Sequence, residues 1–231
     1  MEIIIFIIGA CIGSFILLVA ERYAHSESII KPNSHCFSCH KELKWFDKIP
    51  LVSYLVLQGK SRCCQRKIPI FYFFIEIFTG VIYLYIFIFK INFLPYFIFV
   101  MFFLIVVLQD LLTMTFDTKI LVLLFLSTLF ILIEDFSVFA IKENLPFALF
   151  TLVFFFCISK LTKGMGNGDC YIFSLCSILL GYRTTWFLCI TFIMAGIYAV
   201  LLLLSGKNKK TPIPMLPWIF IAFCMMEYID I

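Results

Sequence analysis

Long apolar runs separated by short charged stretches constrain this chain more than any other feature. Of its residues 63% are hydrophobic and only 14% are charged, against about 25% charged in a soluble domain. Runs of roughly 17–25 apolar residues cross a bilayer as helices. We therefore predict an all-α polytopic membrane protein with about eight transmembrane helices, at 3–20, 71–89, 93–109, 120–133, 145–159, 171–182, 184–204 and 212–228.

The first run is predicted to be a span and not a cleaved signal peptide. A secretory signal begins with a positive segment and ends in a small-residue cleavage site. Here the chain begins Met1-Glu2, and basic residues follow the run instead. This arrangement is typical of a first span whose N-terminus lies outside.

Orientation follows from lysine and arginine, which concentrate on the cytoplasmic side of membrane proteins. With eight spans, 15 of the 18 lysines and arginines fall in the segments 21–70, 110–119, 160–169 and 205–211. We predict that these segments are cytoplasmic and that the loop 134–144 is external. The basic residues flank spans and form no binding stripe, so no nucleic-acid partner is expected.

Four acidic residues in or near the predicted spans are candidates for a function at the membrane: Glu76, Asp110, Asp117 and Asp169. Glu76 lies inside the second run, where a carboxylate is expensive and is either functional or paired structurally. Asp110 ends the third run and Asp169 opens the sixth, both on the predicted cytoplasmic side. Two aspartates at one membrane depth on different helices favour a catalytic pair.

A carboxylate pair suits hydrolysis of an amide because the two groups share one proton. The ionised member takes a proton from water while the protonated member polarises the peptide carbonyl. Gly166 and Gly168 precede Asp169 and are expected to allow close backbone approach and unusual dihedral angles. Asp117 lies seven residues after Asp110 and is assigned a supporting role.

The chain has ten cysteines, most of them in apolar runs as small buried hydrophobes. Four others share the hydrophilic loop after the first run: Cys36, Cys39, Cys63 and Cys64. Cys-x-x-Cys followed by further cysteines predicts a tetrahedral zinc site, completed by Cys63 or by a histidine, His35 or His40. The alternative is a free-thiol loop that folds against the membrane helices and helps to bind a substrate.

These features together resemble the type IV prepilin leader peptidase/N-methyltransferase family, whose members include competence-pseudopilin processing enzymes. The resemblance runs through ordered motifs over nearly the whole chain: Gly13-Ser-Phe15, Arg22, Cys36-Phe-Ser-Cys39, the stretch 43–55, Gly59-Lys-Ser-Arg62-Cys-Cys64, Glu76-Ile-Phe-Thr79-Gly80, Asp110 and Gly166-x-Gly168-Asp169. It implies a GxGD-type intramembrane aspartyl protease in which Asp110 and Asp169 are catalytic.

The resemblance also implies substrates, cofactors and location. Substrates would be prepilins or pseudopilins with basic leader peptides, cut at the cytoplasmic face of a bacterial cell membrane. The new N-terminus would be methylated with S-adenosylmethionine, and the subunits would enter a pilus, a type II secretion pseudopilus or a DNA-uptake apparatus. Residues 1–90 would carry the zinc and methyltransferase region, and 91–231 the peptidase.

Three positions depart from the family's pattern. Leu17 replaces an asparagine, Thr115-Phe116-Asp117 replaces Ile-Pro-Asp, and Ser61 replaces the third cysteine of the loop. The first and third concern the methyltransferase and cysteine region, so the protease is better supported than the methyltransferase. A transporter or a metal-binding membrane scaffold is the alternative function, and an archaeal preflagellin peptidase is disfavoured by the cysteine loop.

Overall fold

The structure is a computed structural model that describes residues 1–31, 33–36, 38–162, 165–206 and 212–228. Within these ranges the regular elements are helices, and β-pairing is limited to isolated bridges in the cysteine loop. The chain divides into two compact units, Met1–Phe97 and Ile98–Ile231. Lys163, Lys207, Lys209 and Lys210, which contributed to the predicted orientation, and Pro32 and Phe37 of the loop motif lie outside the described residues.

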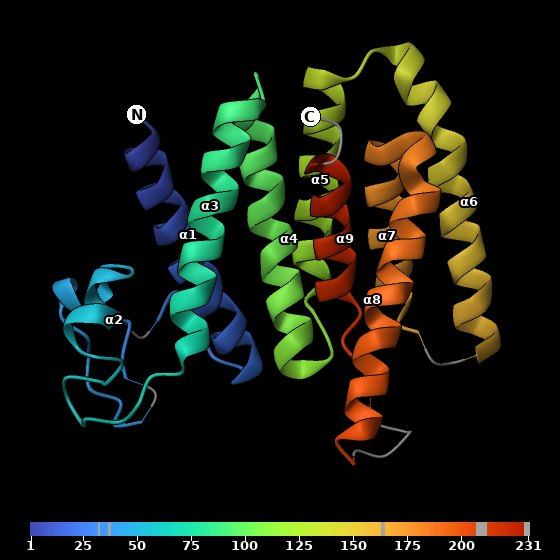
Figure 1. The fold of residues 1–231 in the computed structure, drawn as a ribbon. Helices are drawn as coiled ribbons and strands as arrows, with labels where there is room; N and C mark the ends of the chain where they lie inside the picture. The colour runs from blue at the N-terminus through green and yellow to red at the C-terminus, as the bar shows by residue number, and fades with distance from the viewer. Residues whose placement is uncertain (32, 37, 163–164, 207–211, 229–231) are drawn as a thin grey trace. The chain divides into compact units, whose positions relative to one another are not determined.

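The first unit is a pair of long helices with a loop between them. Helices α1 (Glu2–Ala24) and α3 (Ile70–Phe89) run side by side, and the loop carries the short helices η1 (Trp45–Lys48) and α2 (Val52–Val56) (Figure 1). The unit also contains the start of α4 (Phe93–Thr113). The loop therefore lies at one end of the helix pair.

Glycines bring the backbones of α1 and α3 into direct contact. A Cβ atom on Gly9 would lie 2.9 Å from the Cα of Gly80, and one on Gly13 would overlap the side chain of Thr79. Small residues four apart are a recurrent device for close helix packing in membranes, where burial of apolar surface supplies little drive. The Gly9-x-x-x-Gly13 pattern thus fixes how α1 packs on α3.

The second unit contains the rest of α4 and five further helices. They are α5 (Thr118–Asp135), α6 (Val138–Thr162), α7 (Asn167–Leu180), α8 (Thr184–Leu204) and α9 (Leu216–Tyr228), with the turn η2 (Gly181–Arg183) between α7 and α8. Aromatic rings fill its interior. The rings of Phe155 on α6 and Phe173 on α7 stack with centroids 4.3 Å apart, and Phe103 on α4 meets Phe220 on α9 at 5.0 Å.

The predicted all-α polytopic membrane fold is confirmed. Each of the eight predicted runs coincides with a helix in the described ranges, and five stretches are long and apolar enough to cross a membrane: Glu2–Ala24, Ile70–Phe89, Phe93–Thr113, Val138–Thr162 and Asn167–Leu204. The last stretch contains both α7 and α8. Helix α5 carries Lys119, Glu134 and Asp135 at its ends, and α9 has 13 residues.

Helix α6 differs most from its prediction. It starts at Val138 and continues through Pro146, whereas the sequence predicted a start at 145. The apolar run is interrupted by Lys142 and Glu143, which are exposed here. The helix is therefore longer than its apolar part, because a helix does not end where its hydrophobicity ends.

Candidate functional site

Asp110 lies in the last turn of α4 and is held from another helix. Its side chain is 7% exposed, and one carboxylate oxygen accepts a hydrogen bond of 3.1 Å from the backbone N–H of Leu216. Leu216 is the first residue of α9, whose leading N–H groups have no partner within the helix. The carboxylate of Asp110 thus joins the end of α4 to the start of α9.

Asp169 lies in the first turn of α7. Its backbone N–H donates to the carbonyl of Gly166 at 3.2 Å, and its carboxylate lies directly beside Gly166. The charge of Asp110 acts electrostatically on the Asp169 carboxylate. Asp110 and Asp169 both lie at helix ends in the second unit, although they are distant in the sequence, and their catalytic pairing stays a prediction.

The two glycines before Asp169 behave differently. A Cβ atom on Gly168 would overlap the ring of Phe116, which lies in the connection between α4 and α5. Gly168 therefore allows the close approach that was expected. The expected unusual dihedral angles are absent, since Gly166 has φ −68° and Gly168 is not among the described glycines with positive φ.

Asp117 forms the N-cap of α5. Its carboxylate accepts a hydrogen bond from the backbone N–H of Lys119 at 2.9 Å. Its own N–H donates to the side-chain oxygen of Gln109 at 3.1 Å. Gln109 is 1% exposed and adjacent to Asp110, so it ties the connection after α4 to the helix that carries Asp110. Sequence reasoning passed over Gln109, whose signal is a polar residue at the end of an apolar run.

Glu76 on α3 supports the cysteine loop. Its side chain is buried and accepts a hydrogen bond of 2.7 Å from the N–H of Leu51. Leu51 has φ 60° and ψ −52°, and the N–H of Val52 donates to the carbonyl of Pro50 at 2.6 Å. This is a γ-turn of the rare, strained type. Glu76 therefore has a structural partner, and it holds a backbone conformation that a leucine adopts only under constraint.

The four loop cysteines gather in one place. The Sγ atoms of Cys36, Cys39, Cys63 and Cys64 all lie within 4.8 Å of one another, and all four are free thiols. Cys36 Sγ lies 3.7 Å from Cys64 Sγ, close to the separation of about 3.8 Å that zinc–sulfur bonds of about 2.3 Å give in a tetrahedron. His35 and His40 are not members of this group of described ligands. The fourth thiol of the cluster therefore comes from Cys63, and neither histidine belongs to the cluster.

Two turns of equivalent hydrogen bonding build the cluster. In the first turn, the N–H of Cys36 donates to the carbonyl of Lys41 at 2.9 Å, and the carbonyl of Cys36 accepts from the N–H of His40 at 2.8 Å. In the second turn, Ser61 makes the same two hydrogen bonds with Arg66 and Gln65, both at 2.8 Å. His40 and Gln65 both have positive φ, 55° and 56°. The equivalence assigns Ser61 to the place of Cys36 and Cys64 to the place of Cys39.

Ser61 is buried inside the cluster. Its hydroxyl lies 2.9 Å from the Sγ of Cys63 and 3.4 Å from the Sγ of Cys36. Burial raises the pKa of the Cys36 thiol, but hydrogen bonds from Ser61 and from backbone N–H groups together lower this pKa to about 6. The hydrogen bond with Cys63 raises the pKa of Cys39 to about 12. Cys36 thus ionises more readily than Cys39, and a bound cation would favour the thiolate form of both.

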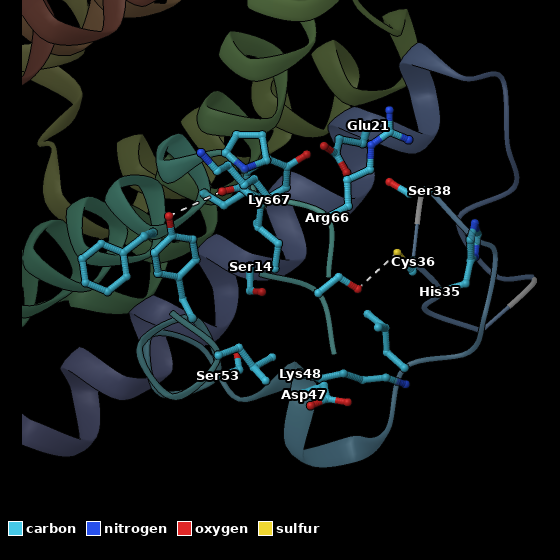
Figure 2. A pocket seen from close by; sticks show the side chains of 18 of the residues that line it. Ser14, Glu21, His35, Cys36, Ser38, Asp47, Lys48, Ser53, Arg66 and Lys67 are labelled. Atoms are coloured by element: carbon cyan, nitrogen blue, oxygen red, sulfur yellow. Dashed lines mark hydrogen bonds between the residues drawn. The ribbon is translucent and has the colours of Figure 1, made fainter. Parts of the chain in front are cut away.

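A cavity of about 450 Å³ lies beside the cluster in the first unit. It is enclosed by the end of α1, the start of α3 and the loop between them, and Figure 2 shows Ser14, Glu21, Cys36 and Lys48 around it. Its size is within the range of about 300–1,000 Å³ of small-molecule sites. Sequence analysis did not predict it, because three separate segments form it.

The comparisons with known proteins agree with this arrangement. The family model "Bacterial Peptidase A24 N-terminal domain" matches residues 7–90. The prepilin leader peptidase/N-methyltransferase of Bacillus subtilis is 27% identical over 224 residues, which are 93% of this chain and 88% of that protein. The chain is similar to prepilin leader peptidase/N-methyltransferases, over residues 7–90 by the family model and over most of its length by the Bacillus subtilis relative. The resemblance predicted from the ordered motifs is confirmed.

Other prepilin leader peptidase/N-methyltransferases are more similar to the chain over shorter stretches. The prepilin leader peptidase/N-methyltransferase of Myxococcus xanthus is 36% identical over 81 residues, 35% of this chain and 24% of that protein. The one from Neisseria gonorrhoeae is 39% identical over 67 residues, 29% of this chain and 23% of that protein. These matches span about a quarter of the relatives' length. No solved structure matches the chain significantly.

Proposed function

We propose that this chain is a membrane-embedded aspartyl endopeptidase that removes the leader peptide of prepilins or pseudopilins. The observation that carries the proposal is the meeting of Asp110 and Asp169 in the second unit. Similarity to known proteins supports it, since these relatives are named for removal of a prepilin leader and for N-methylation. In this reading Asp110 and Asp169 are the catalytic residues, and residues 91–231 form the peptidase region.

The chemistry follows from two carboxyl groups that share a proton. The ionised member takes a proton from a water molecule as the water oxygen bonds to the peptide carbonyl carbon. The protonated member gives its proton to the carbonyl oxygen. When the tetrahedral intermediate collapses, the carbon–nitrogen bond breaks and the nitrogen takes a proton. The products are the carboxylate of the leader and the amine of the mature subunit.

The neighbouring residues would position this pair. The N–H of Leu216 fixes one oxygen of Asp110, and the contact of Gly168 with Phe116 sets the approach of α7. Preorganised groups of this kind raise rates because they need no rearrangement during the reaction. Gly166, Gly168 and Asp117 would act in this supporting way.

We place the aspartate pair and the cysteine loop on the cytoplasmic side of a bacterial cell membrane. The partition of 15 of the 18 lysines and arginines to one side supports this placement. Single engineered cysteines in 21–70 should resist a membrane-impermeant thiol reagent in intact cells, whereas cysteines in 134–144 should react. Labelling of the 21–70 segment in intact cells would reverse the orientation.

We propose that the cysteine cluster holds a structural zinc ion. The donor set fits, since four thiols converge and the hydroxyl of Ser61 lies against two of them. Zinc prefers thiolate ligands in a closed tetrahedral site, and binding would order a polar loop that lacks a core of its own. Protein purified without chelators should contain about one zinc per chain, and a content below about a tenth of that would contradict the proposal.

We propose that residues 1–90 also methylate the new N-terminus. S-Adenosylmethionine, when bound, would supply an electrophilic methyl group to the new amine, with S-adenosylhomocysteine as the leaving group and the amine proton lost to solvent. The cavity beside the cysteine cluster is lined by polar and charged side chains and has a size suited to a small molecule. Substrates would carry basic leaders, and the processed subunits would enter a pilus, a type II secretion pseudopilus or a DNA-uptake apparatus.

Mass spectrometry of a prepilin N-terminus tests the proposal. A prepilin with a basic leader is expressed with this protein, with its Asp169→Asn variant, and alone. Loss of the leader only with the active protein is the expected result, and a further mass of one methyl group would report methylation. A leader that stays intact in all three samples would favour a transporter or a metal-binding scaffold instead.

A further inference from the structure

Helix α2, in the loop of the first unit, turns its apolar side chains outward. Val52, Leu55 and Val56 have the spacing i, i+3, i+4, so they share one face of the helix. They are 54%, 63% and 68% exposed, whereas Ser53 and Tyr54 line the cavity on the inner side. A surface helix in water has the opposite arrangement, with its apolar stripe against the protein. The outer face of α2 is therefore unsuited to water.

The helical turn η1 extends this exposed apolar region. Trp45 is 76% exposed, and Ile49 between η1 and α2 is exposed as well. We call the five exposed side chains the outer apolar surface: Trp45, Ile49, Val52, Leu55 and Val56. A group of large exposed apolar side chains in so short a segment indicates contact with a protein or with a membrane.

Two contacts hold α2 beside α3. The N–H of Leu51, the residue before α2, donates to the carboxylate of Glu76 at 2.7 Å. The ring of Tyr54 stacks on the ring of Phe73 with centroids 5.2 Å apart. Figure 1 shows α2 next to the first half of α3. Helix α2 thus packs on the side of α3 and does not extend away from its end.

The position of these contacts along α3 sets the depth of α2. Glu76 is the seventh residue of α3, which begins at Ile70, so it lies about 9 Å along the helix axis. Helix α3 is one of the candidate membrane spans. In its first two turns it exposes Phe71 and Phe74, as a helix does where it faces lipid. The outer apolar surface is therefore level with the edge of the bilayer.

Basic side chains accompany the outer apolar surface. The segment 41–60 contains four lysines and two acidic residues, and one of the acidic residues, Asp47, is paired with Arg62 at 2.8 Å. Lys44 and Lys48 flank the exposed Trp45 and are themselves exposed. Tryptophan is enriched at membrane–water interfaces, and lysines near the surface are attracted to anionic lipids. This charge complements a lipid surface.

We propose that η1 and α2 form an interfacial anchor in the leaflet at that end of the α1–α3 pair. The outer apolar surface enters the boundary between headgroups and acyl chains, and the lysines contact anionic headgroups. The anchor holds the cysteine loop against the bilayer. This inference goes beyond the proposed function, because it uses neither the aspartate pair nor the methylation. It lies wholly within the first unit.

Quenching of Trp45 fluorescence tests the anchor in the full chain. The chain has three tryptophans, so Trp186→Phe with Trp218→Phe leaves Trp45 as the reporter. The protein is reconstituted in vesicles of phosphatidylcholine and phosphatidylglycerol. Lipid brominated near the carbonyl end of its acyl chains should quench Trp45, and acrylamide on both sides of the membrane should quench it little. Vesicles without phosphatidylglycerol should give weaker quenching by the brominated lipid.

A matched pair of variants tests the outer face of α2. Leu55→Glu, made in the reporter protein, should reduce quenching by the brominated lipid about twofold or more, because a carboxylate there resists burial in lipid. Gln65→Glu adds the same charge at an exposed polar position of the same loop, and quenching should stay unchanged. Equal elution volume and thermal stability show that both variants are folded.

Three results would overturn the inference. Quenching of Trp45 by acrylamide and not by brominated lipid would place the surface in water, open to a protein partner such as a substrate. Protection from both quenchers would show that protein covers it. Equal quenching by brominated lipid in Leu55→Glu and in the reporter protein would remove α2 from the anchor. Leader cleavage is measured separately, so none of these results bears on the peptidase.

Discussion

Ser61 occupies in the second turn of the cysteine loop the position that Cys36 occupies in the first, and its hydroxyl lies 3.4 Å from the Cys36 sulfur. A hydroxyl is a poor zinc ligand, so the proposed zinc ion would need a fourth thiolate from another residue. Cys63, two residues later, approaches Ser61 Oγ to 2.9 Å and Cys39 Sγ to 3.1 Å. The second turn has the same backbone hydrogen bonds as the first, but the fourth thiol of the cluster belongs to Cys63 and not to residue 61.

This relationship predicts a rescue. Cys63→Ser alone should lose most of the zinc, because three thiolates remain. The double variant Ser61→Cys with Cys63→Ser should regain it, because the new thiol stands at the place equivalent to Cys36. Zinc per chain is measured by elemental analysis, with Cys189→Ser on α8 as the control for loss of an unrelated thiol. A double variant as depleted as Cys63→Ser would contradict the equivalence of the two turns.

The aspartate pair predicts a large loss of peptidase activity. Asp110→Asn and Asp169→Asn should each reduce leader cleavage by about 10²–10⁴-fold or more, because neither amide can exchange the shared proton. Cleavage is followed by gel shift or mass spectrometry on purified protein. Either variant with near-normal turnover would remove that residue from the pair.

Asp117→Asn serves as the matched control for the aspartate pair. Asparagine caps a helix as well as aspartate does, so the hydrogen bond to the N–H of Lys119 is kept. Cleavage should remain within a few-fold of normal, whereas Asp117→Ala should destabilise the protein by about 1 kcal/mol. Loss of cleavage in Asp117→Asn as complete as in Asp169→Asn would make Asp117 the second catalytic carboxylate.

Glu76 is predicted to hold the loop by one hydrogen bond. Glu76→Ala should release the γ-turn at Leu51, because a hydrogen bond to a charged group contributes about 1.5–3 kcal/mol. Limited proteolysis should then cut within 25–69 sooner. The exposed Glu143 on α6 provides the comparison, since Glu143→Ala removes the same side chain from the surface. Equal proteolysis rates in the two variants would show that the turn does not depend on Glu76.

The contact of α1 with α3 predicts that a glycine-to-alanine substitution has different effects on stability at Gly13 and at Gly196. Gly13→Ala should lower stability by about 1–3 kcal/mol, because its methyl group would overlap Thr79. Gly196→Ala on α8 should be neutral or raise stability by up to about 1 kcal/mol, since a Cβ there meets nothing within 4 Å and alanine favours the helix. Thermal unfolding in detergent measures both. A drop of equal size in both variants would show that crowding at Gly13 is not the cause.

The helices, which follow from composition and from the length of the apolar runs, were predictable from the sequence. The contacts between residues distant in the sequence were not. Each apolar run became a helix, because burial of apolar side chains and the need to pair backbone groups in a membrane leave few alternatives. The catalytic pairing of Asp110 and Asp169 stays a prediction, but their positions at helix ends followed from the limits of the apolar runs. The hydrogen bond from Leu216 to Asp110 did not, because nothing local in the sequence indicates which helix start will face that carboxylate.

The cysteine loop shows the same division. The four cysteines predict a cluster, and the structure excludes the histidines that the sequence left as alternatives. The equivalence of the two turns is almost invisible in the sequence, since Cys36-Phe-Ser-Cys39 and Ser61-Arg-Cys-Cys64 share one cysteine position. Leu51 offers no sequence signal for positive φ, because leucine rarely adopts it.

The glycine contacts between α1 and α3 have a consequence for motion. With backbones touching at Gly9 and Gly13, no layer of flexible side chains separates the helices, and sliding one along the other would force them apart. Induced fit in the first unit is thus confined to the loop between them, which supplies one wall of the cavity. A ligand that enters would meet a fixed wall of helices and an adjustable wall of loop, so its arrival should be reported by hydrogen exchange in 25–69 and not in the helices.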